Sequence, residues 1–166
     1  MSMYIVDTNF FIQAHRLTYP LDVAISFWNK VKQLANEEKI ISIDKVKQEI
    51  FKHNDILKNW CEKNLPTDFF KDTSHIMTSY KQVVNWSNLQ SSHYLPKALS
   101  EFLSSDEADA FLVAYALDDK DNRIIVTQEI SEPNKKNKVK IPDVCIAFKV
   151  QYVNLIEMYR QLGETF

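Results

Sequence analysis

Two acidic residues stand just after short apolar runs that have the composition of buried strands. Asp7 directly follows residues 4–6, and Glu129 follows residues 123–127 after a single intervening residue. In open parallel sheets, ligands bind outside the carboxyl ends of the strands. If both runs are strands of such a sheet, the two carboxylates meet at the edge where a ligand would bind.

Two further acidic residues lie close to the apolar faces of predicted helices. Glu49 is one helical step from Val46 and next to Ile50. Asp109 lies on the apolar face of its own helix, because the residues three, four and seven positions further on are all apolar. These residues are Leu112, Val113 and Ala116. An unpaired carboxylate on such a face is costly, so Asp109 requires a partner.

Four carboxylates at one edge of a sheet repel one another unless cations lie between them. Ligation by oxygen alone favours Mg²⁺ or Mn²⁺ over zinc. The pattern therefore predicts a divalent-metal site formed by Asp7, Glu49, Asp109 and Glu129.

Each of these four residues also has an ordinary structural explanation. Asp7 would serve as a cap for the turn into the next helix, and Glu49 as a solvated helix residue. Asp109 would complement the helix dipole from the first turn, and Glu129 would be a loop charge. The convergence of all four on one edge favours the metal site over four separate explanations.

The composition excludes several classes of phosphate-binding protein. Gly163 is the one glycine among 166 residues. A Walker A loop, a dinucleotide-binding loop and a nucleophile elbow each need two or more glycines, so phosphate would be bound by side chains or a metal. The formal net charge of −2 also argues against a broad basic surface for sequence-independent binding of nucleic acid.

The sequence further predicts a cytoplasmic protein without a membrane segment. The longest purely apolar run, residues 110–117, is far shorter than the roughly 20 residues that cross a bilayer. The N-terminus lacks the pattern of a signal peptide. Cys61 and Cys145 are far apart and form no C-x-x-C motif, so neither a disulfide framework nor a Cys-rich zinc site is indicated.

Short apolar runs alternate with amphipathic stretches, which predicts a single α/β domain over residues 1–166. The predicted strands are residues 4–6, 40–43, 123–127 and 152–154. The predicted helices are residues 21–38, 44–60, 67–86, 95–103, 108–117 and 142–148, and a last helix that ends at Gly163. Asp44 is expected to cap the second helix, and Ser104 with Glu107 fits a capping box for the helix 108–117. This order predicts a three-layer α/β/α fold with a central, mostly parallel sheet of four to five short strands.

Four segments of the chain carry a resemblance to a known family. They are YIVDTN at residues 4–9, QEI at 48–50, DAFLVAYA at 109–116 and IVTQE at 125–129. In this order and spacing the chain resembles the PIN-domain ribonucleases, and more narrowly the small bacterial PIN-like proteins related to VapC-type toxins. The resemblance implies a PIN-like fold and hydrolysis of RNA that leaves a 5′ phosphate.

The resemblance also implies which residues hold the metal. Asp7, Glu49 and Asp109 match acidic metal-binding positions, and Glu129 stands at a fourth position where the family more often has Asp. The longer side chain of Glu129 can ligate directly or through water, so the resemblance leaves open whether a second ion binds. One ion would activate the attacking water, and a second would stabilise the leaving oxygen.

Other positions are implied to support the acids or the substrate. Thr8 and Thr127 match hydroxyl positions that orient the carboxylates or the attacking water, and Asn9 matches a polar position on the substrate side. Asp106 lies one turn before Asp109 and would either support that carboxylate from behind or complement the helix dipole.

Lysines gather in the segment that follows Glu129, at Lys135, Lys136, Lys138 and Lys140. They would either contact the substrate backbone at the mouth of the acidic cleft or form a solvated surface, since each lysine adds only modest affinity for phosphate. A phosphodiester is itself anionic, so carboxylates need Mg²⁺ or Mn²⁺ to accept it.

The sequence thus predicts a metal-dependent endoribonuclease, as the toxin of a bacterial toxin–antitoxin pair. RNA is the expected substrate, and an antitoxin protein and a second copy of the chain are expected partners by resemblance alone. Two alternatives remain open. The departure at Glu129 is compatible with a non-catalytic PIN-like binding or regulatory module. The same carboxylate chemistry also fits a DNA-directed or flap-type nuclease, because it does not distinguish the sugars.

Overall fold

The centre of the structure is a five-stranded sheet in which every strand runs parallel to its neighbours. The structure is a computed structural model that describes residues 2–166. Its strands are β1 (Met3–Val6), β2 (Ile40–Ile43), β3 (Phe70–Lys71), β4 (Arg123–Val126) and β5 (Gln151–Val153), in the spatial order β3-β2-β1-β4-β5. The predicted α/β/α class with a parallel central sheet is confirmed.

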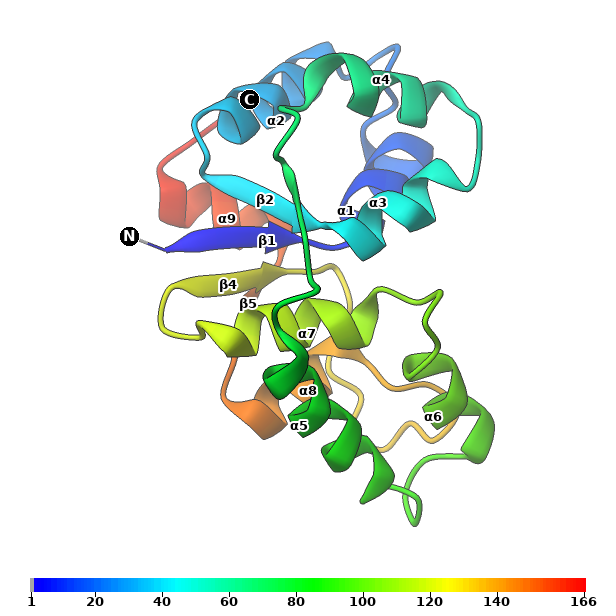
Figure 1. Cartoon of the computed structure of the whole chain (residues 1–166). Coiled ribbons are helices and arrows are strands. Elements are labelled where there is room, and N and C mark those ends of the chain that lie inside the picture. Colours follow the sequence, from blue (N-terminus) through cyan, green and yellow to red (C-terminus); the bar gives the residue numbers. More distant parts are fainter. Residues whose placement is uncertain (1) are drawn as a thin grey trace.

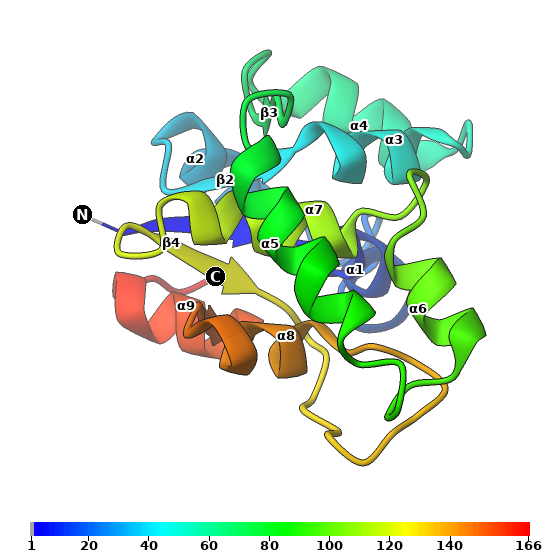
Figure 2. The same cartoon turned by 60° about the horizontal axis from the view of Figure 1, so that its bottom comes forward.

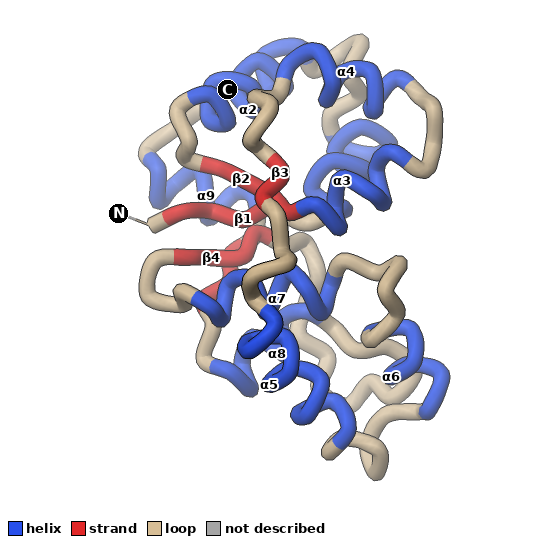
Figure 3. The backbone as a smooth tube through the Cα atoms, in the orientation of Figure 1, coloured by secondary structure: helices blue, strands red, loops and turns tan. Residues whose placement is uncertain are grey.

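Within residues 2–166, nine α-helices and one π-helical segment connect and cover the strands. They are α1 (Thr8–Gln13), η1 (Ala14–Thr18), α2 (Ile25–Asn36), α3 (Asp44–Phe51), α4 (Ile56–Asn64), α5 (Met77–Asn88), α6 (Pro96–Phe102), α7 (Asp109–Asp118), α8 (Ile141–Phe148) and α9 (Leu155–Leu162). Helices α1–α4 gather in the upper half of Figure 1 and α5–α8 in the lower half, with β1 and β4 between them. Figure 3 shows the strands enclosed by these two sets of helices.

Aromatic contacts tie distant segments into the two helical layers. Tyr19, which follows η1, stacks on Phe27 of α2 with ring centroids 4.3 Å apart, and Phe166 meets Phe27 at 5.1 Å. On the other side α5 lies across α7, as Figure 2 shows, and Tyr80 stacks on Phe111 at 4.3 Å. Helix α7 also packs against β4 and α8, so it couples the sheet to this layer.

The chain changes direction across the sheet between β1 and β4. It proceeds from β1 outwards to β2 and β3, then crosses back to place β4 on the other side of β1. The last residues of these two strands, Val6 and Val126, are paired, so Asp7 and Thr127 leave the sheet side by side. In open α/β sheets such a reversal opens a crevice at the carboxyl ends of the strands, where ligands bind.

The strands form because their apolar, β-branched residues are buried on both faces of the sheet. Ile5, Ile43 and Ile125 have no exposed surface. Ser42 is the polar exception within β2, and its buried hydroxyl donates a 2.7 Å hydrogen bond to the carbonyl oxygen of Val6. This bond ties β2 to the end of β1, immediately before Asp7.

The predicted helix 67–86 is wrong in its first part, which contains the edge strand β3. Phe70 pairs with Ser42 of β2, and the helix α5 begins only at Met77. The connecting turn is held by Asp44, whose carboxylate accepts hydrogen bonds from the backbone N–H of Thr73 at 3.2 Å and from its hydroxyl at 2.8 Å. Asp44 is thus the first residue of α3 rather than its cap, and its side chain serves β3 instead.

One other predicted helix and one predicted cap are corrected by the hydrogen bonds of the structure. The helix predicted over residues 44–60 is divided into α3 and α4, because Asp55 caps a new helix by accepting a 3.1 Å bond from the N–H of Lys58. The capping box of Ser104 and Glu107 does not form. Helix α7 begins at Asp109 after Ala108, and the Ser104 hydroxyl accepts from the N–H of Asp106 at 3.3 Å.

No helix within residues 2–166 is both long enough and apolar enough to cross a membrane.

Gly163 ends α9 in the left-handed region, with φ at +68°. We expect Gly163→Ala to lower the free energy of unfolding by about 1 kcal/mol, because a Cβ is disfavoured in this conformation. A Cβ at this position would meet no atom within 4 Å, so the cost is one of backbone conformation and not of collision. Urea unfolding measures it, and Gly163→Asn should cost less because Asn tolerates this region. Equal stability of wild type and Gly163→Ala would contradict this account.

Candidate functional site

Asp7 is a buried residue, and one of its two carboxylate oxygens accepts a well-formed hydrogen bond. Its Oδ1 caps α1 by accepting a 2.7 Å hydrogen bond from the N–H of Phe10, so the structural alternative considered for Asp7 is present in the fold. Its Oδ2 is buried and has no partner in good hydrogen-bonding geometry among residues 2–166, although the Thr127 hydroxyl is near enough to favour the charged carboxylate. The pKa of Asp7 is raised to about 7, mainly by burial. The negative charges of Glu129 and Glu49 also raise it, whereas the Thr127 hydroxyl and the Phe10 N–H lower it.

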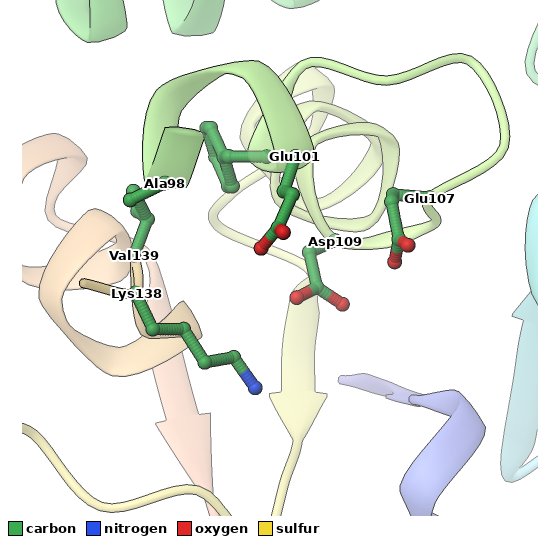
Figure 4. A pocket seen from close by; sticks show the side chains of 7 residues that line it. Ala98, Glu101, Glu107, Asp109, Lys138 and Val139 are labelled. Atoms are coloured by element: carbon green, nitrogen blue, oxygen red, sulfur yellow. The ribbon is translucent and has the colours of Figure 1, made fainter. Parts of the chain in front are cut away.

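Asp109 is the first residue of α7 and its carboxylate points into a pocket (Figure 4). Burial raises its pKa well above the ordinary value, and the negative charges of Glu129, Asp7 and Glu49 raise it further. The Lys138 ammonium works against this shift. The dipole of α7 favours a charge here, yet the neighbouring carboxylates make that charge costly.

Glu49 connects α3 to the beginning of α7. Its Oε1 accepts a 2.5 Å hydrogen bond from the backbone N–H of Ala108, the residue that precedes α7. Because Ala108 has no side chain that could cap a helix, a carboxylate from another helix takes part of that role. Glu49 is therefore a partly exposed residue that contacts the segment immediately before Asp109.

Glu129 uses both of its oxygens inside the protein. Oε1 lies 3.2 Å from Nζ of Lys138, and Oε2 accepts a 2.8 Å hydrogen bond from the N–H of Ile141 at the start of α8. Its side chain is only 8% exposed. The backbone N–H of Glu129 in turn donates to the hydroxyl of Thr127 at 3.1 Å. Glu129 is thus a fixed anion beside Asp7 and Asp109.

The four carboxylates influence one another electrostatically, but they do not form a closed cage. Glu49 and Glu129 affect the pKa values of both Asp7 and Asp109. In the part of the chain from residue 2 to 166, no three His, Cys, Asp or Glu side chains are grouped closely enough to hold a metal ion directly. Mutual repulsion keeps carboxylates apart, and a cation between them removes that repulsion. The donor set is oxygen-only, which suits Mg²⁺ or Mn²⁺.

The pocket in front of Asp109 has a volume of about 300 Å³ and a largely charged lining. Figure 4 shows Asp109 between Glu101 and Glu107, with Lys138 reaching in from the opposite side. Ala98, Phe102 and Val139 complete the lining. Glu101 and Glu107 were not expected from sequence, because their approach depends on how the segment between α6 and α7 folds back. Burial and the charge of Glu49 raise the pKa of Glu107.

Thr127 lies beside Asp7, Thr8 follows Asp7 in the chain, and Asn9 faces a different cavity. The Thr8 hydroxyl is buried and, within the described residues 2–166, unpaired. Thr127 is buried and favours the charged form of Asp7. Asn9 lines a separate small cavity together with Gln128. Asp106 is exposed and is not among the residues that line the pocket of Asp109.

Only one of the four loop lysines lines the acidic pocket. Lys138 does so, whereas Lys135 and Lys140 approach Glu132 at 3.7 and 3.3 Å. Lys136 is exposed, and its carbonyl oxygen accepts a 2.9 Å hydrogen bond from the N–H of Leu95. Lys135 and Lys140 therefore form ion pairs within the segment itself, and Lys138 is the lysine of this segment that lies beside the acidic residues.

Searches among curated proteins and among solved structures returned no match to this chain. One family model matches residues 4–166, which is nearly the whole chain and includes all four carboxylates. Its description is a domain of unknown function, DUF4411. The chain belongs to the DUF4411 family.

Proposed function

We propose that this chain is a Mg²⁺- or Mn²⁺-dependent endoribonuclease. The observation that carries the proposal is the unpaired Oδ2 of Asp7, buried at the reversal point of the sheet beside Asp109 and two further carboxylates. A buried carboxylate oxygen without a donor is costly unless a ligand satisfies it. The resemblance of four segments to the PIN-domain ribonucleases supports the same function.

The available oxygens indicate how a cation would be held. Asp7 offers Oδ2, and Glu49 offers the oxygen that does not bind Ala108. Asp109 offers a carboxylate that faces the pocket. When bound, a divalent cation supplies positive charge to an anionic substrate and makes a neighbouring water molecule more acidic.

The reaction is the hydrolysis of an RNA phosphodiester. The oxygen of a water molecule forms a bond to phosphorus, and the bond from phosphorus to the 3′ oxygen breaks. One proton of the water ends on the 3′ oxygen, so the products are a 3′ hydroxyl and a 5′ phosphate. The buried Thr127 hydroxyl beside Asp7 is suited to orient that carboxylate, and the unpaired Thr8 hydroxyl is available to orient the attacking water.

The wider biological role rests on the resemblance alone. We propose that the chain acts in the cytoplasm as the toxin of a toxin–antitoxin pair, with an antitoxin protein and a second copy as partners. Induced expression in bacteria should arrest growth, and Asp109→Asn should abolish the arrest. Growth arrest that persists in the variant would contradict the proposed role.

Incubation of the purified protein with single-stranded RNA tests the enzymatic proposal. We expect cleavage in Mn²⁺ or Mg²⁺ that stops in EDTA, with 5′ phosphates on the products. A DNA oligonucleotide of the same sequence separates RNA-directed from DNA-directed activity. Cleavage that continues in EDTA would contradict the proposal, and absence of both cleavage and metal binding would favour a non-catalytic module.

A further inference from the structure

Lys138 is the one cationic side chain within residues 2–166 that lines the pocket of Asp109. Figure 4 shows its amino group extending towards the Asp109 carboxylate from the opposite wall. Nζ lies 3.2 Å from Oε1 of Glu129, and 47% of the Lys138 side chain is exposed. The ammonium is thus anchored at one side and open to the pocket at the other.

Several hydrogen bonds fix the segment that carries Lys138. Asp143 at the start of α8 accepts from the Ser131 hydroxyl at 2.5 Å and from the N–H of Glu132 at 3.1 Å. The carbonyl oxygen of Lys136 accepts from the N–H of Leu95 before α6. These contacts fix the backbone of the segment at two points before Lys138, so little backbone entropy is lost when Lys138 binds a ligand.

Both oxygens of Glu129 already accept hydrogen bonds, one from the Lys138 ammonium and one from the N–H of Ile141. The positive charge of that ammonium disfavours a divalent cation beside the same carboxylate. Asp7, Glu49 and Asp109 retain oxygens for one ion, as described above. A second ion would place positive charge beside Glu129. The Lys138 ammonium already places positive charge there.

We propose that Lys138 binds the phosphate of the substrate in place of a second divalent cation. The site then holds a single ion near Asp7, Glu49 and Asp109, and the ammonium faces the phosphate from the side of Glu129. Negative charge grows on the non-bridging oxygens as water attacks phosphorus, and a fixed cation there stabilises the transition state more than the bound substrate. This inference rests on the proposed nuclease function.

Three lysine variants test the assignment. Lys138→Gln can still donate a hydrogen bond to Glu129 but lacks the charge, and Lys138→Arg keeps the charge. Lys120→Gln removes an exposed charge from the turn between α7 and β4, at the opposite end of the sheet. We expect kcat for RNA cleavage to fall about 100-fold in Lys138→Gln with little change in KM. Lys138→Arg should recover most of that loss, and Lys120→Gln should retain the wild-type kcat.

Calorimetric titration with Mn²⁺ gives a second result that does not depend on activity. We expect one bound ion for the wild type and two for Lys138→Gln, because the neutral amide no longer places a positive charge beside Glu129. Two ions on the wild type, or a kcat of Lys138→Gln within threefold of the wild type, would overturn the role of Lys138 while leaving the nuclease intact. A wild type that neither binds Mn²⁺ nor cleaves RNA would overturn both proposals.

Discussion

Asp7→Asn and Asp109→Asn should each lower RNA cleavage by at least about 100-fold, with the protein still folded. Each substitution removes one negative charge from the ligands of the proposed cation and changes almost nothing in volume. Removal of a group that stabilises charge in a transition state costs about 10²–10³ in rate. The kcat in saturating Mn²⁺ measures the effect, and circular dichroism checks the fold.

The matched control for these variants is Asp121→Asn. Asp121 is exposed in the turn between α7 and β4, at the end of the sheet opposite to the candidate site, and its substitution changes the net charge by the same amount. We expect this variant to cleave RNA at the wild-type rate. Asp7→Asn or Asp109→Asn with more than a tenth of wild-type activity would refute the assignment of these carboxylates.

Asp7→Asn should also stabilise the metal-free protein at neutral and higher pH. The pKa of Asp7 is raised from 3.8 to about 7 in the folded chain, so the folded state binds more protons than the unfolded state between these values. The contribution of Asp7 to stability therefore falls as the pH rises from about 4 to about 7, and is constant above that. At 1.36 kcal/mol per pKa unit the loss is on the order of 4 kcal/mol.

An Asn side chain at position 7 can avoid this loss of stability and still cap α1. It carries no charge, and its Oδ1 can still accept the hydrogen bond that Asp7 receives from the N–H of Phe10. Urea unfolding in EDTA at pH 5 and pH 8 measures the effect. We expect the gain in stability of Asp7→Asn over the wild type to be larger at pH 8.

Divalent metal should reverse the order of stability. A ligand that binds only the folded state stabilises it in proportion to the logarithm of its concentration. Mn²⁺ should therefore raise the melting temperature of the wild type and leave Asp7→Asn nearly unchanged. A wild type that is more stable than Asp7→Asn in EDTA at pH 8 would contradict the claim that the charged Asp7 carboxylate destabilises the metal-free protein.

Much of the fold was predictable from the sequence, because the central strands are continuous apolar runs that only burial explains. The edge strand β3 was not, since Phe70–Lys71 contributes two residues and owes its place to pairing with β2 and to the Asp44–Thr73 hydrogen bonds. The start of α7 was predicted to within one residue, but its cap was wrong. Ser104 offered a local capping pattern, whereas the N–H of Ala108 is satisfied by Glu49 from a distant helix.

The sequence indicated which acidic residues lie at the candidate site, but not which groups each of them contacts. The positions of Asp7 and Glu129 follow from strand ends, and that of Asp109 from helical periodicity. The partners of each carboxylate depend on loops, and the sequence alone offers no signal that Glu129 binds Lys138 and the start of α8. The PIN resemblance and the nuclease activity stay predictions.

The most direct measurement is a crystal structure of the wild type soaked with Mn²⁺, with anomalous scattering used to locate the ion. The account predicts one anomalous peak within about 2.5 Å of Oδ2 of Asp7 and of the Asp109 carboxylate, with Lys138 still paired to Glu129. Well-ordered carboxylates without a peak between them at saturating Mn²⁺, or a peak that lies away from Asp7 and Asp109, would contradict it.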